Sequence, residues 1–129
     1  MTERVPEQDT ITDADIVGLP TPIAADLLEA STCCDAGAYR AAALVARRAV
    51  EQVVVMRGVP RDARTLHQKL VWLLKSGHLP GDLAAAARTV SDVGNAASHG
   101  AVAVTREEAK AMVVASLLVV RGAVPATSP

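Results

Sequence analysis

The segment from residue 38 to residue 57 constrains the fold of this chain more than any other, because it is apolar on almost every side. A helix that is hydrophobic all round is stable in water only when other elements surround it. We therefore predict that this segment forms the central helix of a bundle. Before the C-terminal end of this segment, its only polar residues are Tyr39, Arg40, Arg47, Arg48, Glu51 and Gln52.

Helix-starting and helix-stopping residues divide the rest of the chain. Proline after threonine predicts one helix start, two capping boxes predict two more, and glycines predict the stops. The fold class expected is all-α, a compact five-helix bundle in a domain over residues 21–122. Residues 1–20 are expected to be a flexible acidic N-terminal arm, and residues 123–129 a disordered C-terminal tail. The expected helices are 21–36, 38–57, about 65–76, 82–98 and 105–121.

The apolar residues are chiefly Ala, Val and Leu, and the only aromatic residues are Tyr39 and Trp72. Small side chains allow helices to approach closely. Five helices of this size are not expected to cover the 38–57 helix completely, and the helix at 105–121 has a similar apolar surplus. We therefore expect a homodimer that forms through these two helices.

Charge and hydropathy narrow the class of protein. The net charge of −1 disfavours a surface built entirely for nucleic acid, although the first 29 residues carry seven carboxylates and one arginine, and the rest is net basic. An acidic arm on a basic body has two interpretations: the arm covers a basic face, which would include Arg47, Arg48 and Arg88, or it is a disordered tail that only keeps the protein in solution. The start of the chain lacks a secretory pattern, and its longest apolar stretch is about half of the roughly 20 residues that span a membrane. We expect a cytoplasmic protein with no membrane contact, no cofactor and no metal site.

A polar stripe on the 82–98 helix is the candidate site. Asn95 and His99 are four residues apart and share a face, and Asp92 and Arg88 continue that face one and two turns earlier. A second charged group, Arg47, Arg48 and Glu51, lies on the central helix. The candidate binding residues are Arg47, Arg48, Glu51, Arg88, Asp92, Asn95 and His99, and the candidate catalytic residues are His99 and Asn95.

Structural roles compete with this interpretation. Asn95 and His99 are also expected to bond the carbonyls at the end of their helix and the loop that follows. The charged group on the central helix is equally typical of ion pairs. Gly94 favours close helix packing.

Five short segments resemble, in order and spacing, the prokaryotic family called domain of unknown function 4145. That family is similar to a branch of the HEPN superfamily (higher eukaryotes and prokaryotes nucleotide-binding), whose all-helical domains commonly dimerise and occur in defence systems and toxins. The segments are 36–43, 47–51, 66–70, 94–100 (Gly94-Asn95-Ala96-Ala97-Ser98-His99-Gly100) and 105–109.

The resemblance implies a function, and it also implies that one residue of the catalytic motif is missing. Active HEPN members are metal-independent ribonucleases with an arginine, a polar residue directly after it, and a histidine a few positions on. Asn95 and His99 match the last two, but Gly94 occupies the arginine position and Ser91 the alternative one. The resemblance therefore favours a non-catalytic HEPN-like module, a homodimer that binds a protein or RNA partner in a defence, phage or regulatory context. The alternatives are a ribonuclease rearranged around Asn95, His99 and a displaced arginine, and a purely structural oligomer.

Overall fold

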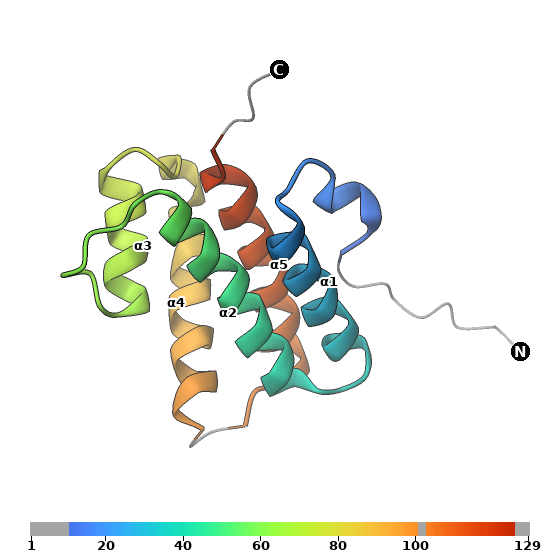
Figure 1. The fold of residues 1–129 in the computed structure, drawn as a ribbon. Coiled ribbons are helices and arrows are strands. Elements are labelled where there is room, and N and C mark those ends of the chain that lie inside the picture. Colours follow the sequence, from blue (N-terminus) through green and yellow to red (C-terminus); the bar gives the residue numbers. More distant parts are fainter. Residues whose placement is uncertain (1–10, 101–102, 126–129) are drawn as a thin grey trace, which may run out of the picture.

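The computed structural model describes residues 11–100 and 103–125 and contains five α-helices and two short 3-10 helices (Figure 1). This confirms the all-α, five-helix expectation, and the described residues include no β-strand. Each predicted helix boundary lies within two residues of the observed one. The elements are η1 Asp13–Ile16, α1 Thr21–Asp35, α2 Tyr39–Met56, α3 Leu66–Lys75, η2 Gly81–Leu83, α4 Ala84–His99 and α5 Arg106–Ala123.

Local chemistry explains the helix starts at α3 and α5. Thr65 accepts a hydrogen bond from the backbone N–H of Gln68 at 3.0 Å, and Thr105 accepts one from Glu108 at 3.0 Å. The Gln68 and Glu108 side chains in turn accept bonds from the two threonine N–H groups. Both predicted capping boxes are therefore formed, and they satisfy backbone donors that a helix start leaves unpaired.

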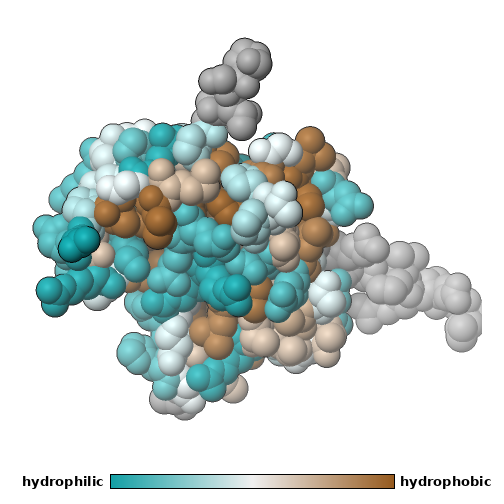
Figure 2. Space-filling view, in the orientation of Figure 1, coloured by the Kyte–Doolittle hydropathy of each residue, from teal (hydrophilic) through white to brown (hydrophobic). Residues whose placement is uncertain are grey.

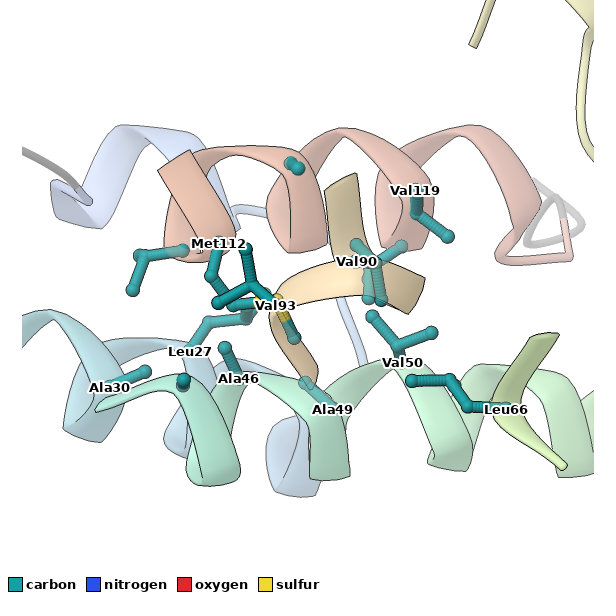
Figure 3. Packing of buried hydrophobic residues seen from close by; sticks show 14 of the residues in the cluster. Leu27, Ala30, Ala46, Ala49, Val50, Leu66, Val90, Val93, Met112 and Val119 are labelled. Carbon is teal, nitrogen blue, oxygen red and sulfur yellow. The ribbon is translucent and has the colours of Figure 1, made fainter. Parts of the chain in front are cut away.

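The predicted central helix is α2, which contacts α1, α3, α4 and α5. In Figure 1 it crosses the front of the bundle, with α1 to its right and α3 to its left. Alanines let these neighbours approach closely, and Figure 3 shows Ala46 and Ala49 within the buried cluster that α2 shares with α4 and α5. The fully buried residues of α2 are Ala42, Ala43, Ala46, Ala49, Val50, Val53 and Val54.

The apolar surplus of α2 is therefore covered mainly inside the chain. Its large exposed apolar side chains are Val55 and Met56, at the C-terminal end of the helix. On α5, Val114 and Leu118 are exposed. The exposed apolar surface of α2 is therefore much smaller than its sequence predicts, because four helices pack around it.

Contacts with the helical bundle continue on both sides of the expected 21–122 domain. Ile11, Ile16 and Leu19 pack against the core, so burial of apolar surface holds this part of the predicted arm on the domain. Arg121 donates a hydrogen bond to the carbonyl of Asp15, and Ala123 is fully buried in α5. The remainder of the predicted arm and tail, residues 1–10 and 126–129, lies outside the described residues. No helix among the described residues is both long and apolar enough to span a membrane.

Ser116 offers a test of the core. Its side chain is fully buried in α5, and its hydroxyl has no hydrogen-bond partner among the described residues. A buried hydroxyl without a partner destabilises the folded state, so we expect Ser116→Ala to raise the free energy of unfolding by about 1 kcal/mol. Urea denaturation measures this change. A loss of stability in the variant would show that the hydroxyl makes a stabilising bond.

Candidate functional site

Two arginines of α2 bind the C-terminal half of α4. Arg40 Nε donates to the carbonyl oxygen of Ala97 at 2.9 Å, and Arg47 Nη1 donates to the carbonyl oxygen of Gly94 at 3.2 Å and to Ser98 Oγ at 2.5 Å. The two arginines are seven residues apart, so they leave α2 on one face. Cations at this place satisfy carbonyl groups and oppose the negative end of the helix dipole.

This arrangement replaces the structural role expected for Asn95 and His99. Among the described residues, neither side chain forms a hydrogen bond, and the arginines from α2 reach the carbonyls instead. Asn95 is half-buried and His99 is exposed on the last turn of α4. The helix ends at Gly100, whose φ of 69° lies in the left-handed region and whose N–H bonds the Ala96 carbonyl.

Arg47 also belongs to an ion-pair network between α2 and α3. Its Nε lies 3.5 Å from Glu51 Oε1, and Glu51 Oε2 lies 3.4 Å from Lys69 Nζ. The ion-pair interpretation of Arg47 and Glu51 is thus confirmed. These three side chains are occupied with one another and with α4, so they hold helices together.

Arg48 points to a different part of the molecule. Consecutive helix residues are separated by about 100° around the axis, and Arg48 lies 3.7 Å from the buried carboxylate of Asp26 on α1. Gln52 also donates to that carboxylate, at 2.5 Å. Arg48 is therefore not part of the α4 site. A groove of about 740 Å³ follows this α1–α2 contact, and Val55 and Met56 line its apolar end.

Arg88 and Asp92 line a groove of about 410 Å³ between α3 and α4, with His67 on the α3 side. None of these three side chains forms a hydrogen bond or ion pair with the residues that the structure describes. The sequence did not predict the place of His67 in this groove. The signal that could have found it is the pair of apolar faces, represented by Leu70 and Ala87, that bring α3 and α4 together.

The seven candidate residues thus occupy separate surroundings. The α2 cations are divided between α4 and α1, and the first half of the α4 stripe faces α3. The proposed cover of Arg47, Arg48 and Arg88 by the acidic arm depends mainly on residues 1–10, which lie outside the described residues. Asp13 and Asp15, which are described, form no ion pair with those three arginines.

Gly94 lies where the sequence predicts close packing. A Cβ atom built on it would lie 2.9 Å from Leu66 Cδ2 and 3.4 Å from Met112 Cε. Both neighbours are themselves almost fully buried. The packing interpretation is confirmed, because even a methyl group at residue 94 requires Leu66 to move.

The family model called Domain of unknown function (DUF4145) matches residues 28–119. The chain belongs to this family. The match covers most of the helical domain, including the arginines of α2 and the whole of α4 in this DUF4145 protein. No curated protein and no solved structure matches the chain. Within the part of the chain that the structure describes, His, Cys, Asp and Glu side chains do not gather into a group that could hold a metal ion.

The contacts of Arg47 predict a stability effect. We expect Arg47→Met to lower the free energy of unfolding by about 1–2 kcal/mol, because it removes charge-assisted hydrogen bonds to α4 and keeps most of the aliphatic packing. Arg88→Met is the matched control, since Arg88 is exposed, and a change within about 0.5 kcal/mol is expected. Urea denaturation compares the two. Equal losses in both variants would contradict a special role for Arg47.

Proposed function

We propose that this DUF4145 protein is a non-catalytic HEPN-like interaction module that works as a homodimer. The all-helical fold and the family membership support the proposal, together with Asn95 and His99 at the positions that match the HEPN motif. We extend the proposal to a cytoplasmic protein, and the HEPN resemblance extends it to a role in defence, phage biology or regulation, with a protein or nucleic acid as partner.

The packing around Gly94 is the observation that carries the non-catalytic part. The HEPN resemblance requires an arginine at residue 94 or at residue 91 to stabilise charge on a phosphate, but Gly94 packs against Leu66 and Met112, and Ser91 is itself buried. Arg47 is the arginine that contacts this turn, but it is bonded to Gly94, Ser98 and Glu51. Its use by a substrate would break contacts that join α2 to α4.

The exposed apolar residues of α5 support the homodimer. Val114 and Leu118 are 42% and 44% exposed and lie four residues apart, so they share one outward face. On α2, Val55 is 70% exposed beside Met56. Burial of such side chains between two copies is favourable at about 25 cal/mol per Å² of apolar surface.

RNA cleavage tests the absence of catalysis. We expect the purified protein to leave single-stranded and structured RNA intact, and Gly94→Arg to gain no activity. The new side chain cannot fit in the core, so this variant should lose about 3 kcal/mol or more of stability. Ala96→Arg, at an exposed position of α4, is the control and should fold normally. Cleavage by the native chain that disappears in His99→Ala would favour the rearranged ribonuclease.

Light scattering tests the assembly. We expect a dimer at micromolar concentration, and a shift toward monomer in Leu118→Glu and in Val55→Glu, because each places a charge in an apolar contact. Thr32→Glu is the control, since Thr32 is exposed on α1 and does not line the groove that Val55 and Met56 line. A native chain that is monomeric at micromolar concentration would contradict the homodimer, and retention of the dimer in both variants would place its interface elsewhere.

A further inference from the structure

Positive charge is concentrated in α3 and the segment before it. Residues 57–75 contain five of the chain's 13 Lys and Arg residues and one of its 14 Asp and Glu residues, in a protein whose net charge is −1. Two of these cations have structural partners: Arg57 bonds the Ala123 carbonyl, and Lys69 pairs with Glu51. The remaining three, Arg61, Arg64 and Lys75, are exposed, and their charged groups form no ion pair among the described residues.

Two open grooves flank α3. One, of about 410 Å³, lies between α3 and α4, and the other, of about 500 Å³, lies between α3 and the 60–63 segment. Both are lined by His67 and Val71, so they meet on α3. We call the two grooves and the exposed cations beside them the α3 surface. Figure 2 shows apolar side chains surrounded by hydrophilic ones in the region of α3.

The lining of each groove combines apolar side chains with one cation and one carboxylate. In the α3–α4 groove these are Arg88 and Asp92, together with the apolar Leu70 and Leu74. In the other groove, Lys75 and Asp62 accompany Pro60, Val71 and Trp72. A ligand that fits both grooves therefore needs apolar groups for the floors, negative charge for the cations, and hydrogen-bond donors for the carboxylates.

A peptide meets these requirements better than a nucleic acid does. Peptide N–H groups can donate to Asp62 and Asp92, and a peptide can space its carboxylates among uncharged residues, whereas a nucleic acid carries a phosphate at every nucleotide and so cannot keep negative charge away from both carboxylates. Trp72 is the only tryptophan, and its ring already packs against the ring of His78 at a centroid distance of 5.1 Å. The α3 surface thus offers little for the successive base stacking that single strands use.

We propose that the α3 surface binds an acidic amphipathic peptide segment of a partner protein. Two apolar side chains of the peptide enter the two grooves, and its carboxylates face Lys75, Arg88 and the exposed arginines before α3. The inference deepens the proposed function, because it rests on the interaction-module role and names the class of partner and the surface that receives it. It requires no contribution from Asn95, His99 or the homodimer contacts.

Trp72 provides the measurement, because it lines one groove and is the sole tryptophan. The probes are 12-residue peptides without tryptophan, in which two leucines stand three to seven positions apart among glutamates and serines. We expect at least one spacing to change the Trp72 emission in a saturable way. We expect the affinity to fall as salt rises, and to fall when glutamine replaces glutamate in the peptide.

Two double variants with the same change in net charge distinguish specific binding at the α3 surface from general electrostatic attraction of the peptide to the protein. Lys75→Gln with Arg88→Gln removes two cations from the α3 surface and should raise Kd about tenfold. Thr32→Glu with Ala41→Glu changes the net charge equally at exposed positions of α1 and α2, and should leave Kd within about twofold. Val71→Ser, at the junction of the grooves, should weaken binding without changing its dependence on salt.

Several results would overturn the proposal. These are no saturable change in Trp72 emission at any leucine spacing, equal weakening in the two double variants, or tighter binding of a 12-nucleotide single-stranded RNA than of every peptide. The last result would assign the α3 surface to nucleic acid. The proposed function fails by different measurements, namely RNA cleavage that depends on His99 or a monomer in light scattering, so the two failures are distinguishable.

Discussion

The fold depends on the burial of the alanine- and valine-rich face of one helix, α2. α2 contacts the other four α-helices, and its alanines at 42, 43, 46 and 49 are fully buried. Alanine has no side-chain entropy to lose and brings neighbouring backbones close together, so the contacts around α2 are made largely by the valines and leucines of the surrounding helices. A larger residue at these positions would push two helices apart. This close packing allows a chain with almost no aromatic residues to bury its core side chains almost completely.

The few polar residues of α2 determine how the surrounding helices are joined. Arg40 and Arg47 reach the end of α4, Glu51 connects α2 to α3, and Arg48 and Gln52 meet Asp26 of α1. Each direction follows from the angular position of the residue around the helix. A charged residue on a central helix therefore serves first as an interhelical contact, which is why the charged group of α2 does not assemble into a single binding site.

On α4, Asn95 and His99 are the residues that resemble the HEPN motif, whereas Gly94 before them has no room for the arginine that the resemblance requires. Asn95 and His99 remain accessible, but the position before Asn95 is packed against α3 and α5. The neighbouring α3 surface carries exposed cations that form no ion pairs among the described residues. These cations lie beside apolar grooves. In this arrangement α3 has two roles, since Leu66 fills the core at Gly94 while His67, the next residue, lines the grooves.

Local signals in the sequence were sufficient for the helices themselves. Threonine capping boxes, glycine stops and the all-round apolar pattern of α2 depend on residues a few positions apart, so they predicted the five helices, the central place of α2 and the packing role of Gly94. The sequence also led to the family. Contacts between distant residues could not be obtained in this way, because the direction of a side chain depends on how helices rotate and pack against one another. Only the tertiary structure showed which helices Arg47 and Arg48 contact, brought His67 to Arg88 and Asp92, and placed residues 11–19 on the domain, because each of these outcomes is decided by packing between segments that are far apart in the chain.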